Sequence, residues 1–252
     1  MEGKFGFPVE SSGQTVQKTL LEELLESTPE TDHLDPQLIF LTVLAGIVAL
    51  IGLFVNNVAI IIGAMVISPM LAPIYACTIF LANGKFIRSL KNLGVLIGLL
   101  VLLIVTSAAI TWLLLFFVEL SVTPEILART GRNEIYIVLA IVLGITAIVA
   151  HKRGFIESVT GIGIAAALAP PAVVTGISLV LYPLGMIRAL LLTFDNIFGL
   201  LTGMFIAILV LGVGPRHESR KKLARKGVYI TVMMLAVVIV LLYLSIRFGN
   251  LA

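Results

Sequence analysis

Residues 58–82 read VAIIIGAMVISPMLAPIYACTIFLA and contain no charged side chain. About 20 apolar residues suffice for a helix to cross the hydrocarbon core of a bilayer. Backbone polar groups in that medium must be hydrogen-bonded within the protein, so this run is predicted to be helical. Its two prolines, Pro69 and Pro73, predict an interruption near its middle.

Six further apolar runs accompany this one along the chain. The seven runs are Leu38–Val55, Val58–Ala82, Leu93–Val118, Ile135–Ala150, Val159–Tyr182, Ile187–Val213 and Val228–Ile246. The chain is 59% hydrophobic and only 12% charged, which is far from the composition of a soluble domain. The predicted fold class is all-α: a polytopic membrane protein with about seven transmembrane helices. The second and fifth runs carry prolines, so each either spans the membrane or forms a re-entrant hairpin.

The distribution of Lys and Arg favours full spans. If every run spans, 13 of the 17 basic residues fall on the side that holds the amino terminus and the loops 83–92, 151–157 and 214–227. If both proline-containing runs re-enter, the split is 10 against 7. Cytoplasmic loops carry an excess of Lys and Arg. The amino terminus is therefore expected in the cytoplasm and the carboxyl terminus outside.

The first three runs and the next three follow one plan: a plain helix, a proline-broken helix and a long helix. Three spans per copy give the copies opposite orientations, as in the inverted repeats of secondary transporters. The case rests on hydropathy and proline placement, because few aligned positions are identical. The predicted organisation is a cytoplasmic acidic segment with a short amphipathic helix at Thr15–Ser27 (1–37), a three-helix repeat (38–118), an extracytoplasmic loop (119–134), a second three-helix repeat (135–213), a basic cytoplasmic loop (214–227) and an appended seventh helix (228–252).

Two stretches carry a family resemblance. Asn56-Asn57 followed by GAMVISPMLAP (63–73), and later GIGIAAALAPP (161–171), resemble the signature stretches of a prokaryotic membrane family called the uncharacterized hydrophobic domain, a domain of unknown function. The resemblance covers roughly residues 38–212 and implies a multi-pass protein of a prokaryotic cell membrane. Many members of that family carry a soluble region before the membrane part, whereas a short acidic segment precedes it here. The resemblance implies no activity.

The prolines supply the first candidate site. A helical proline leaves the carbonyl four residues earlier without its usual donor, and such carbonyls cannot face lipid. The two proline-containing runs are therefore expected to meet in the interior. Ser68-Pro69 is interpreted as an N-cap followed by a first helical residue, and Ala169-Pro170 as a weaker version. Half-helix ends near the midplane bind anions or cations, and the sequence leaves the sign open. Ordinary proline kinks are the alternative.

Asp195 supplies the second candidate site, because a carboxylate deep inside a membrane span is by default a hypothesis of function. Asp195, Gly199 and Gly203 follow one another at i+4 steps, so the carboxyl is expected to face the bundle. Its predicted role is a protonatable or cation-binding group, and the alternative is a hydrogen bond to a carbonyl freed by proline. The candidate solute- or ion-binding residues are Asn57, Ser68, Pro69, Pro73, Pro170, Pro171, Thr175, Asp195 and Asn196. A helix-capping role would also explain Asn57, and a hydrogen bond to the backbone of its own helix would also explain Thr175.

Other chemistries find little support in the sequence. One cysteine, Cys77, and three dispersed histidines predict no metal site and no cofactor. No catalytic arrangement lies in the spans, so an enzyme is not expected. The basic residues follow loops and predict no nucleic-acid partner. The expected function is a transporter or channel-like protein for a small solute or ion. The alternative is a non-transporting scaffold or lipid-interacting protein. The bilayer is the expected partner, and small-residue helix faces predict a homo-oligomer.

Overall fold

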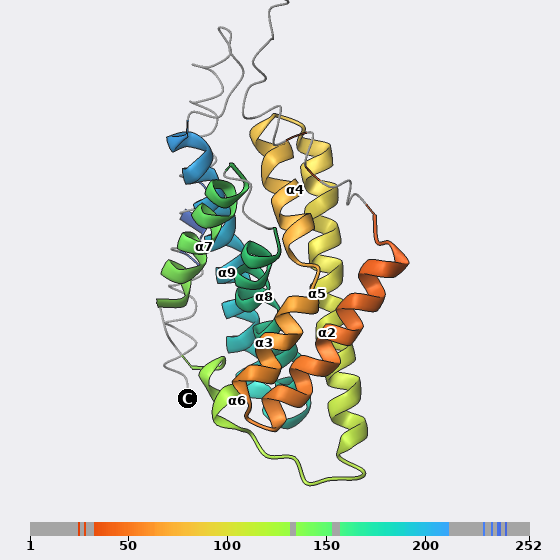
Figure 1. The fold of residues 1–252 in the computed structure, drawn as a ribbon. Coiled ribbons are helices and arrows are strands. Elements are labelled where there is room, and N and C mark those ends of the chain that lie inside the picture. The colour runs from red at the N-terminus through yellow and green to blue at the C-terminus, as the bar shows by residue number, and fades with distance from the viewer. Residues whose placement is uncertain are drawn as a thin grey trace, which may run out of the picture.

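The computed structural model describes residues 33–131, 135–152 and 157–211, with a few single positions nearer the chain ends. These residues form helices and no strand, which confirms the all-α class. In chain order the helices are α2 (Pro36–Phe54), α3 (Val58–Ile67), α4 (Leu71–Ala82), α5 (Phe86–Leu114), α6 (Pro124–Ala128), α7 (Ile135–Lys152), α8 (Glu157–Leu181) and α9 (Pro183–Val210) (Figure 1).

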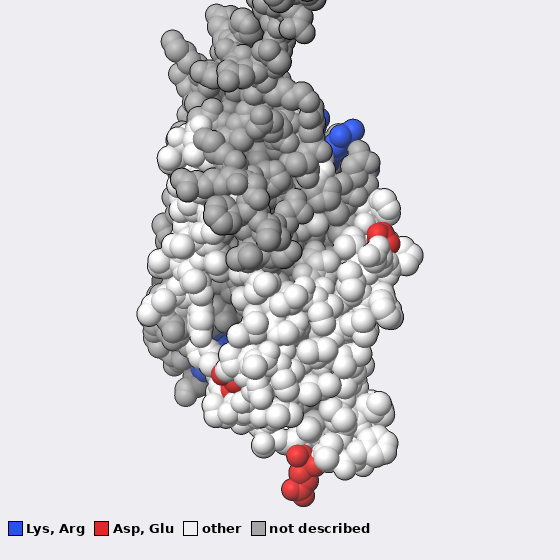
Figure 2. Space-filling view, viewed as in Figure 1, with Lys and Arg blue, Asp and Glu red and all other residues white. Residues whose placement is uncertain are grey.

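The helices have the length and composition of membrane spans. Helices α2, α5, α8 and α9 each qualify alone, and the bent α3–α4 pair makes a fifth candidate. Helix α7 is apolar but shorter. Most of the described surface in Figure 2 carries no charge, as a lipid-facing surface requires. The predicted helices at Thr15–Ser27 and Val228–Ile246 fall outside the described residues apart from single positions, so the number seven stays a prediction.

Successive long helices run in alternating directions (Figure 1). Helices α2, α5 and α8 descend in that view, whereas α3–α4, α7 and α9 ascend. The turn between α4 and α5, the end of α7 and the end of α9 therefore lie at the upper end. Short helix α6 lies at the lower end, beside the turn between α2 and α3.

The interruption predicted at Pro69 is present. Helix α3 stops at Ile67, α4 starts at Leu71, and the two axes are bent by 54°. A hairpin would need a near reversal, so the pair instead continues from one end of the molecule to the other (Figure 1). Ser68 is the C-cap of α3 and not an N-cap of α4, because its backbone is extended and its N–H donates to Ala64 O at 3.2 Å. Residues 68–70 are called the linker below.

The second predicted interruption is wrong. Helix α8 continues through Pro170 and Pro171 without a break. The side chain of Asn196 on α9 donates from Nδ2 to the Ala167 carbonyl at 2.7 Å, and this is the carbonyl that Pro171 leaves without a helical donor. A neighbouring helix thus replaces the missing bond, so the chain has no need to leave the helix here.

Both proline-containing stretches lie in the interior, at different heights along α8. Ser68, Pro170 and Pro171 are buried, and α8 packs on α3, α4, α5, α7 and α9. Leu71, at the start of α4, lies against Gly161 of α8. Gly161 precedes Pro170 by more than two helical turns, so the linker and the α8 prolines do not meet.

Glycines bring helix pairs into backbone contact. A side chain at Gly176 of α8 would collide with the Ile104 carbonyl and Ser107 on α5. Between α7 and α9 the arrangement is reciprocal: Gly144 faces the Leu200 carbonyl, and Gly203 faces the Ile141 carbonyl. The i+4 face of α9 predicted from Gly199 and Gly203 therefore packs on α7 and not on lipid.

The alternating directions predict that the 83–92 loop and the 119–123 segment are reached from opposite sides of the membrane. Lys85 and Ser121 are exposed at these places, whereas Ser89 is buried against the Cys77 carbonyl and suits labelling poorly. In a Cys77→Ala background, Lys85→Cys and Ser121→Cys should react with a membrane-impermeant maleimide from opposite sides of sealed vesicles. Labelling of both from one side would show that α5, the helix between the two positions, does not cross the membrane.

The reciprocal glycines predict a steric cost for a single methyl group. Gly203→Ala should destabilise the protein by about 1–3 kcal/mol, since the methyl group forces α7 and α9 apart. Gly94→Ala is the matched control, because nothing lies within 4 Å of a methyl group there. It should leave stability unchanged or raise it, as alanine favours helix. Thermal unfolding in detergent compares the two, and equal midpoints would contradict the close α7–α9 contact.

Candidate functional site

A cavity of about 90 Å³ lies between α6, α7, α8 and α9. It is lined by Arg129, Tyr136, Leu139, Leu143, Ala166, Ala167, Pro171, Leu192 and Asn196. Ala167 and Asn196 lie close to the middle of their helices, whereas Arg129 immediately follows α6. The cavity thus reaches from the end of the molecule that carries α6 towards the bundle centre. It has room for a few water molecules or a small ion.

The inner end of the cavity lies at the two prolines of α8. Pro170 and Pro171 leave the carbonyls of Ala166 and Ala167 without helical donors, and both alanines line the cavity. Asn196 Nδ2 donates a hydrogen bond to the Ala167 carbonyl. The Ala166 carbonyl, on a residue that lines the cavity, therefore has no N–H four residues along its own helix.

Asn196 places a second acceptor at the inner end. Its side chain is 3% exposed, and Oδ1 is buried without a hydrogen-bond partner. The bond from Nδ2 to a carbonyl fixes which end of the amide is oxygen, because a carbonyl accepts only from a donor. Leaving a buried acceptor unpaired costs about 1–3 kcal/mol.

Asp195 lies beside this site and outside it. The residue is 3% exposed, and its Oδ1 has no hydrogen-bond partner. It shares the α9 face of Gly199, which packs on α7, and it is not among the residues that line the cavity. The alternative role predicted for Asp195 was a hydrogen bond to a carbonyl freed by proline, but at the Ala167 carbonyl the amide of Asn196 is the donor instead.

The remaining predicted site residues are dispersed. Asn57 is exposed and caps α3, with Oδ1 accepting from Ala59 N at 2.9 Å and Ile60 N at 3.3 Å. Thr175 donates to the Pro171 carbonyl at 2.8 Å within its own helix. Pro73 is buried in the first turn of α4, and Ser68 lies in the linker with its hydroxyl buried and unpartnered. None of these residues lines the cavity, so Pro171 and Asn196 are the two predicted site residues in its described lining.

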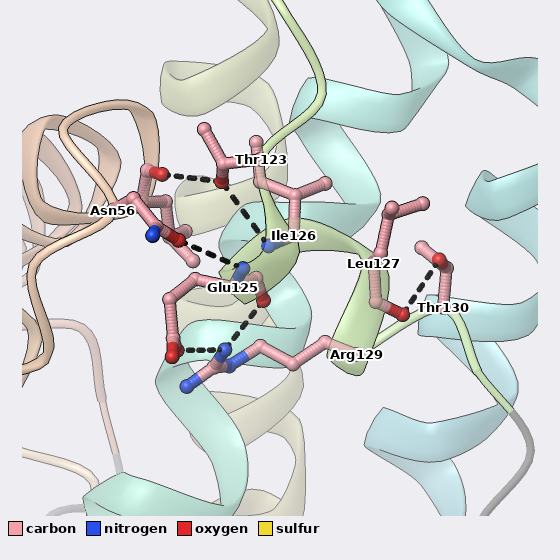
Figure 3. A network of polar contacts seen from close by, with 8 residues as sticks. Asn56, Thr123, Glu125, Ile126, Leu127, Arg129 and Thr130 are labelled. Atoms are coloured by element: carbon pink, nitrogen blue, oxygen red, sulfur yellow. Dashed lines mark hydrogen bonds and ion pairs between the residues drawn. The ribbon is translucent and has the colours of Figure 1, made fainter.

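The outer end of the cavity holds two residues that the sequence interpretation missed, Arg129 and Tyr136. Arg129 Nη1 donates to the Glu125 carbonyl at 2.5 Å and to Glu125 Oε2 at 2.7 Å (Figure 3). The available signal was Thr123-Pro124, a helix cap and first residue, followed by Glu125 and Arg129 at i,i+4 spacing.

Helix α6 is fixed in place from two sides. Thr123 Oγ1 donates to the Leu53 carbonyl at 2.7 Å, and Glu125 N donates to Asn56 Oδ1 at 3.2 Å, which ties α6 to the turn between α2 and α3 (Figure 3). Thr130, just after α6, lies against Gly185 in the first turn of α9. These contacts set the position of Arg129 at the cavity mouth. Within the described ranges no three His, Cys, Asp or Glu side chains converge on a metal site.

Residues 65–202, more than half of the chain, match the family described as Domain of unknown function (DUF389). The chain belongs to the DUF389 family. The matched residues run from the end of α3 into α9 and include the linker and the whole cavity lining. The chain is also similar to the uncharacterized protein MJ0678 of Methanocaldococcus jannaschii, at 23% identity over 238 residues that cover 94% of this chain and 73% of the relative. No solved structure matches the chain.

These matches confirm membership in a family of unknown function. Neither the family description nor the relative's name states an activity. The function of this DUF389 protein therefore has to be inferred from the chemistry of the cavity.

The Asn196–Ala167 bond predicts a specific coupling between two mutations. Asn196→Ala should cost about 1–3 kcal/mol, because the Ala167 carbonyl loses its donor in the bundle. Pro171→Ala restores a backbone N–H four residues after Ala167, so Asn196→Ala in that background should cost much less. Thermal unfolding of the wild type, both single variants and the double variant forms the cycle.

Additive effects would show that Asn196 does not replace the missing helical bond. Thr193→Val is a matched control on α9, because the Thr193 hydroxyl donates only within its own helix, to Ala189 O at 2.9 Å. Its effect should be the same in the wild type and in the Pro171→Ala background.

Proposed function

We propose that this protein is a membrane transporter or channel-like protein for a small solute or ion, with its site in the cavity beside Pro171 and Asn196. The supporting observation is Asn196, a residue that lines a cavity near the bundle centre and whose buried Oδ1 has no hydrogen-bond partner. Intramembrane polar groups that face cavities characteristically mark solute pathways. Backbone carbonyls freed inside a membrane bundle are a recurring feature of transporter sites.

The position of α6 supports a path from one side. The cavity begins at Arg129 and ends at Asn196, about halfway along α9. A solute entering beside α6 would therefore stop near the midplane. The linker between α3 and α4 is the proposed moving part, because the helical hydrogen-bond ladder is interrupted there.

Several wider expectations belong to the same proposal. The chain is proposed to lie in a prokaryotic cell membrane with its amino terminus inside, on the basis of the basic loops and the resemblance to the uncharacterized hydrophobic domain family. The two inverted repeats are compatible with the alternating helix directions (Figure 1). Only the first copy has a broken helix, so a repeat would have diverged at this feature. A homo-oligomer and the absence of enzymatic activity remain predictions.

A scaffold or lipid-interacting protein is the second candidate. The observation that favours it is the close backbone packing of α7 on α9 and of α5 on α8, which makes these pairs rigid. The Gly199/Gly203 face is used within the chain, so it is not available for an oligomer contact.

Reconstituted vesicles distinguish the two functions. Purified protein in liposomes should pass at least one of a panel of small anions, cations and neutral solutes faster than protein-free vesicles do. Asp195 is the proposed protonatable group, since it is buried beside Asn196 without a partner for Oδ1. Asp195→Asn should assemble normally and lose that flux or its dependence on pH, because the amide keeps the shape and removes ionisation.

Two results would decide against parts of this proposal. Wild-type flux equal to that of empty vesicles for the whole panel would favour the scaffold. Unchanged flux and unchanged pH dependence in Asp195→Asn would remove Asp195 from the mechanism and leave the cavity as the site. Thr193→Val, two positions earlier on the same helix, is the control for a general effect of altering α9.

A further inference from the structure

Positive charge gathers at the start of α5. Among the side chains that the structure describes, the exposed Lys and Arg residues are Lys85, Arg88 and Lys91, which lie within two helical turns of one another. Figure 2 shows basic side chains near the upper end of the molecule, where α4 leads into α5 in Figure 1. The exposed Glu119 follows the other end of α5. The two ends of this helix therefore present opposite charges.

The helix itself does not favour this arrangement of charge. Lys85 is the N-cap of α5 and makes no side-chain cap, and the first turn contains no acidic residue. The amino-terminal end of a helix is the positive end of its dipole, so basic side chains are unfavourable there. Lys85, Arg88 and Lys91 also follow one another at i,i+3 spacing, at which like charges repel. An anionic partner would relieve both repulsions.

An aromatic ring of α4 draws two of the charges together. Lys85 Nζ lies 6.0 Å and Arg88 Cζ lies 5.8 Å from the centroid of the Phe80 ring. Phe80 is buried in the last turn of α4. Cation–π attraction acts at this range. The two charges therefore converge on the end of α4, although both side chains stay exposed.

Exposed apolar side chains stand beside these charges. Phe86, Ile87 and Leu90 are each more than half exposed. Exposed Ile97 and Val101 continue the face of Ile87 and Leu90 further along α5. The six residues of the first two turns are called the 85–91 patch: Lys85, Phe86, Ile87, Arg88, Leu90 and Lys91. A small soluble anion would match its charges and leave its apolar side chains uncovered, whereas a partner with a negative group and an apolar tail covers both.

The 85–91 patch lies at the depth of the lipid headgroups. Helix α5 has 29 residues and is about 44 Å long, whereas the hydrocarbon core of a bilayer is about 30 Å thick. The patch comes before the uncharged run Leu93–Val118, which fills that core. Residues 85–91 therefore extend into the layer that contains the phosphates of the phospholipids.

From these observations we propose that the 85–91 patch binds an anionic phospholipid of the surrounding bilayer. Lys85 and Arg88 attract the headgroup phosphate, and an acyl chain lies along Ile87 and Leu90. The recognition is electrostatic, so phosphatidylglycerol is preferred to the zwitterionic phosphatidylcholine. This site is separate from the cavity. It goes beyond the proposed function, because it holds for a transporter and for a scaffold alike.

Tryptophan fluorescence in vesicles tests this preference at the patch itself. Trp112 is the only tryptophan of the chain, so Phe86→Trp in a Trp112→Phe background places a single reporter in the patch. The protein is reconstituted in phosphatidylcholine vesicles with a fixed minor fraction of either brominated phosphatidylglycerol or brominated phosphatidylcholine, since acyl-chain bromine quenches a tryptophan that it contacts. Phosphatidylglycerol should quench more strongly, with a relative affinity of about fivefold or more at low salt. Added salt should reduce the difference.

Trp112 in the otherwise unchanged protein is the matched control. It is more than half exposed and lies in the last turn of the same helix, about 39 Å from Phe86. Residues 112–128 contain no Lys or Arg. The two brominated lipids should therefore quench Trp112 alike. An equal preference at Trp112 and at position 86 would show general enrichment of anionic lipid around the protein and would overturn the site.

Charge variants in the Phe86→Trp background test the assignment to Lys85 and Arg88. Lys85→Gln with Arg88→Gln should lower the preference to the level at Trp112. Lys85→Arg with Arg88→Lys keeps both charges and should retain it. Equal quenching by the two lipids at position 86, or a preference that survives the loss of both charges, would overturn the proposal.

Soluble glycerol phosphate separates a lipid from a free phosphate ester. Because the acyl chain contributes to binding, excess glycerol phosphate should reduce the preference no more than sodium chloride of the same ionic strength does. Loss of the preference in glycerol phosphate alone would identify a free phosphate ester as the ligand and overturn the lipid assignment.

Discussion

One side-chain hydrogen bond, from Asn196 to the Ala167 carbonyl, permits the most buried helix of the bundle to contain two consecutive prolines. Helix α8 packs on almost every other helix, so a break in it would disturb the whole bundle. In a hydrocarbon environment the carbonyl released by Pro171 has no water to bind. A neighbouring amide supplies the donor at 2.7 Å, and α8 stays continuous. The same residue lines the cavity and keeps a buried, unpaired oxygen, so the residue that completes the hydrogen bonding of α8 also belongs to the candidate site.

Apolar run length predicted most of the fold. The described helices coincide with six of the seven runs because, in lipid, the backbone has almost no alternative to a helix. The predicted ends of the helices were less accurate. Helix α5 begins at Phe86 and not at Leu93, because charged residues at the membrane interface can continue a helix beyond its apolar run. The interruption of the helix was predicted correctly at Pro69 and wrongly at Pro170. The difference depends on Asn196, a partner on another helix, which a local pattern does not contain.

The candidate site was predicted only in part. Pro171 and Asn196 were both in the predicted set, and the cavity contains both. Asn57 and Thr175 proved to have local partners, because their short polar side chains reach their own backbone first. Arg129 lies within residues 119–134, which were predicted to be an extracytoplasmic loop. Its place at the cavity follows from α6, a helix of five residues that is too short to give a hydrophobic period and that is held by contacts to distant turns.

The linker and α8 also differ in how they can bend. No side chain caps the start of α4, and a proline removes a backbone donor within the linker, so residues 68–70 form a natural pivot, whereas α8 is braced by Asn196. Helix α4 has 12 residues and is about 18 Å long. A rotation of about 10° at the pivot would swing its far end by about 3 Å, roughly the width of one water molecule. A small rotation at the linker, inside the membrane, would thus be amplified into a larger displacement of the carboxyl-terminal end of α4, at the surface beside Gly84.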